Sequence, residues 1–149
     1  MRDKIAKIIN TVFGIGFLPL MPGTYASAAG CALYFLMRDH ALLQLAVAAI
    51  TTSTGFAAAG RAEALFKKKD PKEVVIDELC GMLIAYLYLP YSLSTLVLGF
   101  FIFRAMDILK VFPANRLERL PGSLGIMLDD ISAGIMTNII LRVISYLHA

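Results

Sequence analysis

Residues 41–60 read ALLQLAVAAITTSTGFAAAG and contain no charged side chain. A helix needs about 20 consecutive apolar residues to cross the hydrocarbon core of a bilayer, so this stretch is long enough to span one. The whole chain of 149 residues is similarly apolar, with 58% hydrophobic and 17% charged residues and a mean hydropathy of +0.73. Soluble domains have about 25% charged residues. The sequence therefore predicts that lipid covers much of the folded surface.

Four further stretches are mostly apolar and long enough to contain a helix each: residues 25–37, 74–89, 92–106 and 131–147. The first is short and follows a loop rich in Gly and Pro, so we expect it to cross the bilayer only with help from that loop. The sequence predicts a single all-α integral membrane domain over residues 1–149. It has about five helical segments, some of them short or re-entrant.

Lys and Arg are concentrated in three segments. Residues 61–72 contain five of them, residues 110–119 contain three, and residues 2–7 contain three more. The short connections between the other apolar stretches contain only Arg38. Because loops rich in Lys and Arg stay in the cytoplasm, we expect the N-terminus and both long loops to face the cytoplasm and the C-terminus to face outward.

Two pairs of acidic residues stand beside apolar stretches. Asp77 and Glu78 begin one apolar helix, and Asp129 and Asp130 directly precede another. A carboxylate at membrane depth costs about 2.5–3.5 kcal/mol, so adjacent acids favour a bound cation that offsets their charge. The alternative is that both pairs are ordinary acids at helix starts, outside the lipid, where they interact favourably with the helix dipole.

Small residues follow both acidic pairs at helical spacing. Gly81 lies four residues after Asp77, and Gly134 lies four residues after Asp130. Small residues allow helices to approach closely, so we expect the two acidic pairs to meet. Ligands that are all oxygen atoms suit magnesium, calcium or manganese rather than zinc.

Arg104, Asp107 and Lys110 are spaced by three residues and are expected on one helical face. Asp107 is then a further candidate metal ligand. Arg104 and Lys110 are candidates to bind phosphate oxygens, Arg as a fork and Lys as a point charge. A simple ladder of ion pairs within the helix is the alternative.

Residues 14–24 form a turn-rich loop before a helix. Backbone amides at a helix start can bind phosphate, and Thr24 is the candidate phosphate ligand there. The alternative is an ordinary re-entrant connection.

Composition and motifs exclude several functional classes. The net charge is only +3, the chain has no tryptophan, and its other aromatic residues lie in apolar stretches, so we expect no nucleic-acid partner. The two histidines, His40 and His148, lie far from the acids. The chain has no Gly-x-Ser-x-Gly motif for a serine nucleophile and no Cys-x5-Arg loop for a cysteine nucleophile. Carboxylates with basic partners remain, as is typical of metal-assisted phosphoryl transfer.

Four motifs in order carry a family resemblance that extends from Gly14 to Gly134: PLMPGTYAS (19–27), DPKEVVIDELCG (70–81), FRAMDILK (103–110) and PGSLGIMLDDISAG (121–134). This set resembles the phosphatidylglycerophosphatase A family. The resemblance implies a magnesium-dependent membrane phosphatase that converts a phospholipid, phosphatidylglycerophosphate, to phosphatidylglycerol during bacterial lipid synthesis.

Together, the resemblance and the charge pattern predict a multi-pass protein of the bacterial cytoplasmic membrane, with a magnesium site facing the cytoplasm. The predicted metal ligands are Asp77, Glu78, Asp107, Asp129 and Asp130. The predicted catalytic residues are Asp77, Glu78, Asp129 and Asp130, and the predicted phosphate ligands are Thr24, Arg104 and Lys110. The sequence leaves open whether water or an Asp attacks the phosphorus, and it does not predict the oligomeric state.

Two other functions are compatible with the composition. A small cation transporter would use the acids as an ion path, but it would place them at several membrane depths. The predicted orientation gathers them on one side, which favours the enzyme. A non-catalytic lipid-binding membrane subunit is the second alternative.

Overall fold

The computed structural model describes residues 2–68 and 71–147, with Glu63 described by its backbone alone. Asp70 of the second motif and His148 therefore lie outside the described residues. The elements are α1 (Arg2–Asn10), η1 (Ile15–Phe17), α2 (Pro22–Leu36), α3 (Ala41–Ala59), α4 (Ala62–Phe66), α5 (Ile76–Ala85), α6 (Leu93–Leu109), α7 (Ala114–Leu117) and α8 (Ser123–Leu147). All regular elements in this part of the chain are helical, which confirms the all-α prediction.

The number of helices differs from the predicted number of about five. Each of the five apolar stretches overlaps one helix, namely α2, α3, α5, α6 and α8, although α2, α6 and α8 extend beyond the predicted bounds. Three shorter helices, α1, α4 and α7, lie outside those stretches. α4 has five residues and α7 has four, which is too short for a periodic pattern to be recognised in the sequence.

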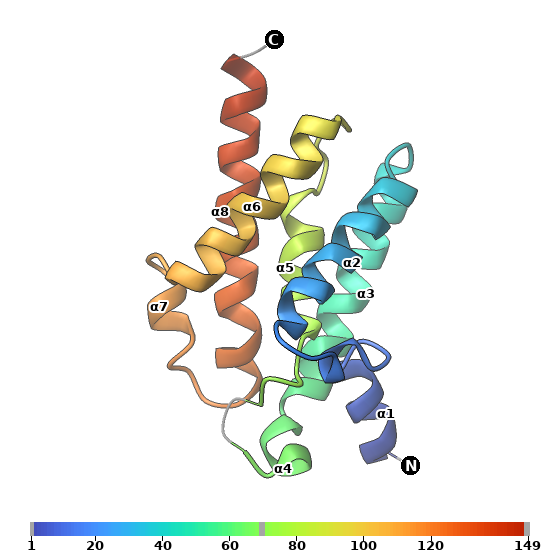
Figure 1. Cartoon of the computed structure of the whole chain (residues 1–149), viewed down its shortest axis with the longest axis vertical. Coiled ribbons are helices and arrows are strands. Elements are labelled where there is room, and N and C mark those ends of the chain that lie inside the picture. The colour runs from blue at the N-terminus through green and yellow to red at the C-terminus, as the bar shows by residue number, and fades with distance from the viewer. Residues whose placement is uncertain (1, 69–70, 148–149) are drawn as a thin grey trace.

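Two helices in the described part of the chain are long and apolar enough to cross a membrane: α3, with 19 residues, and α8, with 25. α5 has ten residues. At 1.5 Å per residue it is about 15 Å long, too short to cross the hydrocarbon by itself. It is instead the central helix, with seven buried residues and with α2, α3, α6 and α8 packed around it (Figure 1).

The close approach of α5 and α8 was predicted from their glycines, and the structure confirms it. A Cβ atom added to Gly81 would lie 2.6 Å from the carbonyl oxygen of Asp130. Real Cβ atoms essentially never come so close to another heavy atom, so glycine is required for this spacing. The two helices that carry the acidic pairs are therefore in direct backbone contact.

Side chains of α8 satisfy the carbonyl groups at the end of α5. The Nδ2 atom of Asn138 donates to the carbonyl oxygens of Ile84, Ala85 and Leu87 at 3.0–3.3 Å. Arg142 donates to the Leu87 carbonyl oxygen at 3.1 Å. A helix end inside an apolar bundle has no water to bind its free carbonyl groups. Protein side chains must then replace the water, as Asn138 and Arg142 do here.

The two ends of the bundle differ in character. The short helices α1 and α4 lie at one end, with α7 beside the same half of the bundle, while the turn between α2 and α3, the start of α6 and the end of α8 lie at the other end (Figure 1). The acidic pairs lie in the half that carries the short helices, because α5 and α8 both begin there.

Candidate functional site

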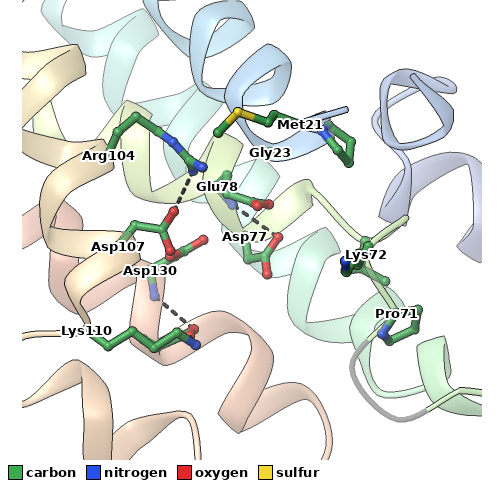
Figure 2. Close-up of a pocket in the computed structure, with 13 residues that line it drawn as sticks. Met21, Gly23, Pro71, Lys72, Asp77, Glu78, Arg104, Asp107, Lys110 and Asp130 are labelled. Atoms are coloured by element: carbon green, nitrogen blue, oxygen red, sulfur yellow. Dashed lines mark hydrogen bonds and ion pairs between the residues drawn. The ribbon is translucent and has the colours of Figure 1, made fainter. Parts of the chain in front are cut away.

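Four chain segments that are distant in sequence meet in one polar cavity of about 270 Å³ (Figure 2). They are the start of α2, the loop before α5 with its first turn, the end of α6 and the second turn of α8. The lining residues are Met21, Pro22, Gly23, Pro71, Lys72, Val74, Asp77, Glu78, Arg104, Asp107, Lys110, Asp129 and Asp130. The cavity thus contains every predicted site residue except Thr24.

Three carboxylates converge at this cavity. Asp77 and Glu78 lie in the first turn of α5, and Asp130 faces them from α8. One carboxylate oxygen from each residue lies within 4.8 Å of the other two. Asp130 is buried, with 3% of its surface exposed, and the other two are partly buried. Three negative charges this close repel strongly in a poorly solvated site, so the arrangement favours a bound cation.

One oxygen of Glu78 has no partner in the described part of the chain. This atom, Oε2, is buried. All three residues offer oxygen ligands, the type that magnesium, calcium and manganese prefer. Buried polar atoms are nearly always satisfied in folded proteins, so a cation is the natural partner of this oxygen.

Gly23 at the start of α2 makes room for Glu78. A Cβ atom at Gly23 would lie 2.1 Å from the Oε1 atom of Glu78. The loop before α2 therefore contributes to the site through its backbone and through Met21 and Pro22. Thr24 does not line the cavity, and its hydroxyl oxygen is buried without a hydrogen-bond partner among the described residues.

Arg104 is held in the cavity by Asp107 on the next turn of α6. Its Nη1 atom donates to Asp107, and both side chains are largely buried, with 14% and 16% of their surfaces exposed. The Nε atom of Arg104 is buried and has no partner within the described residues. A buried donor on a guanidinium group suits a phosphate oxygen, because charged acceptors form its strongest hydrogen bonds.

Lys110 leaves the helical face that it was predicted to share with Arg104. α6 ends at Leu109, and Lys110 follows with a left-handed backbone at φ 45°. Its Nζ atom contacts the carboxylates of Glu118 and Asp129, the latter at 3.1 Å. Burial lowers the pKa of Lys110, but these two ion pairs outweigh that effect and raise the pKa above its usual range.

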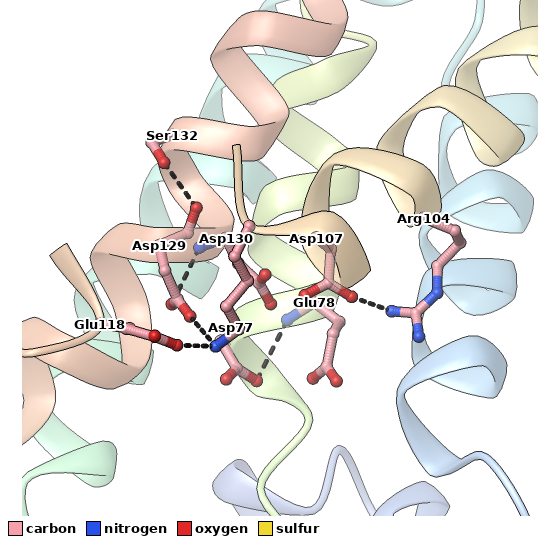
Figure 3. A network of polar contacts seen from close by, with 9 residues as sticks. Asp77, Glu78, Arg104, Asp107, Glu118, Asp129, Asp130 and Ser132 are labelled. Carbon is pink, nitrogen blue, oxygen red and sulfur yellow. Dashed lines mark hydrogen bonds and ion pairs between the residues drawn. The ribbon is translucent and has the colours of Figure 1, made fainter. Parts of the chain in front are cut away.

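Asp129 and Asp130 have different surroundings. They were predicted to precede the last apolar helix, but α8 begins at Ser123 and places both residues in its second turn. Neighbouring residues on a helix point about 100° apart. Asp130 therefore joins the three-carboxylate cluster, whereas Asp129 faces Lys110 (Figure 3).

Three charged residues of this region were not among the residues predicted from the sequence: Lys72, Glu118 and Arg119. Lys72 lines the main cavity, and Glu118 and Arg119 line an adjacent cavity of about 570 Å³. The two cavities share Asp77, Lys110 and Asp129. Lys72 lies within the DPKEVVIDELCG motif, which was a usable signal, but its charge was interpreted only as part of a cytoplasmic loop. No motif marked Glu118 or Arg119.

Comparison with known proteins extends over nearly the whole chain. The sequence profile of the family described as Phosphatidylglycerophosphatase A matches residues 8–145. A protein of Bacteroides thetaiotaomicron named "Putative phosphatidylinositol-3-phosphatase" is 36% identical over 145 residues, covering 91% of each chain. Proteins named phosphatidylglycerophosphatase A from Escherichia coli and Haemophilus influenzae are 33% and 32% identical, covering 90% of this chain and 80% and 85% of theirs. No solved structure matches. The chain belongs to the phosphatidylglycerophosphatase A family.

Proposed function

We propose that this chain is a membrane phosphatase that removes the terminal phosphate of phosphatidylglycerophosphate and releases phosphatidylglycerol. The observation that carries this function is the cavity in which Asp77, Glu78 and Asp130 converge beside Arg104. A phosphomonoester carries close to two negative charges, so its hydrolysis needs cationic groups that neutralise the phosphoryl oxygens. Family membership and the names of two relatives support the same substrate.

The donor set supports Asp77, Glu78 and Asp130 as the ligands of a magnesium ion. Asp107 and Asp129, the other two predicted ligands, are paired with Arg104 and Lys110 and lie outside the three-carboxylate cluster. Magnesium bound at such a site polarises the phosphoryl group and neutralises the charge that develops during transfer. This assignment is narrower than the set of five carboxylates predicted from the sequence.

Arg104, Lys72 and Lys110 are the phosphate ligands that the cavity offers. Arg104 lines the cavity, and Asp107 fixes the orientation of its guanidinium group. Lys72 lies at the exposed part of the cavity wall. Lys110 is less available, because Glu118 and Asp129 already occupy its amine.

We assign the role of general base to Asp129. When water is the nucleophile, hydrolysis breaks the bond between phosphorus and the glycerol oxygen and forms one between phosphorus and the water oxygen, and a carboxylate can accept the proton of that water. Asp129 lines both cavities, lies outside the three-carboxylate cluster, and is held by Lys110 at 3.1 Å. The proton then passes to the alkoxide that leaves with the glycerol.

A substrate panel tests this function. Purified protein in detergent micelles would be assayed for phosphate release from phosphatidylglycerophosphate, phosphatidylinositol 3-phosphate and phosphatidic acid. The relative at 36% identity carries a phosphoinositide name, and both substrates present a phosphomonoester on a lipid headgroup, so the comparison is necessary. We expect the highest kcat/KM for phosphatidylglycerophosphate. A higher value for the phosphoinositide would reassign the substrate, and no release from any lipid would reject the function.

We further infer that the protein is a multi-pass protein of the bacterial cytoplasmic membrane with the site at its cytoplasmic end. The half of the bundle that carries α1, α4 and α7 holds most of the Lys and Arg residues, which the positive-inside rule places in the cytoplasm. A reporter that is active only outside the cytoplasm, fused after residue 149, should be active. An inactive reporter there, with an active one fused before residue 1, would reverse the orientation.

A further inference from the structure

The segment from α1 to α2 exposes several large apolar side chains beside lysines. Phe13 is 89% exposed, Leu20 is 92% exposed and Phe17 is 55% exposed. Lys4 and Lys7, with Phe13 and Phe17, line a mainly apolar cavity of about 500 Å³, and Leu20 follows Phe17 in the same loop. We call Phe13, Phe17 and Leu20 together with Lys4 and Lys7 the N-terminal apolar surface. Clustered exposed apolar residues mark a surface that contacts another protein, a ligand or a membrane.

The backbone holds two of these side chains outward in an unfavourable conformation. Phe13 has φ 54° and Leu20 has φ 74°, both in the left-handed region that residues other than glycine seldom adopt. The Phe13 turn is fixed by Thr11, whose hydroxyl donates to the Lys7 carbonyl at 2.9 Å and accepts from the Gly14 amide at 3.1 Å. Strained backbone that presents exposed apolar side chains is a sign of function rather than of packing.

The N-terminal apolar surface lies beside the cavity that contains the three carboxylates. The amide of Val75 donates to the Asn10 carbonyl at 2.8 Å. A Cβ atom at Gly16 would lie 2.0 Å from the carbonyl oxygen of Glu73, so the loop packs against the backbone just before Asp77. The chain then continues from Leu20 into Met21 and Pro22, which line the cavity itself. In Figure 1 the loop between α1 and α2 lies beside the first turns of α2 and α5.

The lysines of this surface indicate a partner with negative charge. The Nζ atom of Lys7 lies 5.2 Å from the centre of the Phe17 ring, so a cation sits directly at the edge of the apolar residues. α1 itself is amphipathic, with Ile5 and Ile8 exposed among Lys4 and Lys7. Apolar side chains bordered by lysines match the headgroup region of an anionic bilayer, which offers acyl chains below and phosphates above.

We propose that the N-terminal apolar surface inserts into the boundary between headgroups and acyl chains of an anionic membrane leaflet. Insertion of Phe13 and Leu20 fixes the depth of the adjacent cavity, so that a lipid phosphate reaches Arg104 without leaving the leaflet. This role adds to the proposed phosphatase function, which does not by itself specify how the cavity is placed relative to the leaflet.

Tryptophan fluorescence tests the insertion independently of catalysis. The chain has no tryptophan, so F13W and L20W each create a single reporter. N115W, at an exposed polar position of α7, is the matched control. The proteins would be reconstituted in vesicles of phosphatidylcholine and phosphatidylserine, with and without lipids brominated near the carboxyl end of the acyl chains. We expect bromine to quench F13W and L20W strongly and N115W weakly. Equal quenching of all three would overturn the proposal.

The lysines are tested in the same vesicles. Adding Lys4→Gln and Lys7→Gln to F13W should reduce quenching in anionic vesicles to the level seen in phosphatidylcholine alone. Each lysine near an anionic surface changes binding about fivefold. Quenching that is insensitive both to phosphatidylserine and to the two lysines would remove the anionic lipid from the proposal.

A kinetic comparison shows whether the surface serves the reaction, and this part rests on the proposed function. The double variant F13S/L20S should raise KM for substrate in vesicles while kcat for a short-chain substrate in micelles stays at the wild-type value. Tyr146→Ser, a change at an 84% exposed residue at the opposite end of the bundle, should alter neither. Equal effects of F13S/L20S in both assays would contradict a role in membrane placement. If wild-type protein releases no phosphate in either assay, the phosphatase function fails, but the fluorescence result still stands.

Discussion

Gly134 of α8 lies so close to Gly81 of α5 that a Cβ atom added to Gly134 would be 2.3 Å from the Gly81 carbonyl oxygen. Asp130 and Asp77 each lie one helical turn before these glycines, so the glycine contact sets the distance between the two carboxylates. The geometry of the acidic cluster therefore depends directly on how closely α5 and α8 pack.

Replacing Gly134 with Ala should separate the helices and disrupt the cluster. We expect the free energy of unfolding to fall by about 1–3 kcal/mol, as for overpacked cores. We also expect kcat to fall, because the carboxylates are displaced. Thermal unfolding in detergent and phosphate release would measure both. Gly60→Ala is the matched control, because a Cβ atom there would be no closer than 3.8 Å to any other residue's heavy atoms. A Gly134→Ala variant as active as Gly60→Ala would contradict this account of the site.

The neighbouring residues Asp129 and Asp130 should respond differently to the same substitution. Asp130→Asn should raise the magnesium concentration needed for half-maximal rate, because Asp130 belongs to the three-carboxylate cluster. Asp129→Asn should lower kcat about 10²-fold or more, as expected for loss of a general base, with little change in magnesium dependence. Magnesium titrations of phosphate release would separate the two effects. If both variants shift the magnesium requirement equally, Asp129 is also a ligand.

Lysine should not substitute for Arg104, since its single ammonium nitrogen cannot reproduce the planar guanidinium group, in which one nitrogen holds Asp107 while the others stay available to phosphate. A charged hydrogen bond contributes about 1.5–3 kcal/mol, so R104K should lower kcat/KM about 10- to 100-fold. Arg116→Lys, a change on α7 where the guanidinium group lies over Phe112, is the control and should have no effect. Unchanged kcat/KM in R104K would remove Arg104 from the phosphate site.

Asn138 should matter for stability, because it satisfies three carbonyl groups at the end of α5. Asn138→Leu leaves buried acceptors without partners, which costs about 1–3 kcal/mol. The melting temperature in detergent should fall, while KM in the folded fraction should stay unchanged because Asn138 does not line the catalytic cavity. An unchanged melting temperature would mean that Arg142 or water satisfies these carbonyls alone.

The sequence was sufficient to predict the long helices and the meeting of the acids. Each apolar stretch overlaps a helix, because lipid and core both select apolar residues at nearly every position. The meeting of Asp77 with Asp130 followed from glycines at helical spacing, a local signal that bears directly on packing distance.

The individual roles within the site could not be predicted because they depend on where helices begin and end. The start of α8 at Ser123, within a stretch rich in Gly and Pro, rotates Asp129 away from Asp130's partners. The end of α6 at Leu109 turns Lys110 toward Glu118. Such boundaries are the least reliable part of a sequence-based prediction. Lys72 differs from these residues: it lies within the second motif, but the charge of a lysine in a basic loop does not by itself separate a site residue from a solvated one.

The most direct test of the central claim is phosphate release from phosphatidylglycerophosphate by the purified protein in detergent micelles, with added magnesium or with a chelator. The three-carboxylate cluster predicts release with magnesium, loss with the chelator, and recovery when magnesium is restored in excess. Equal release under both conditions would contradict the metal site, and no release under either would contradict the proposed function itself.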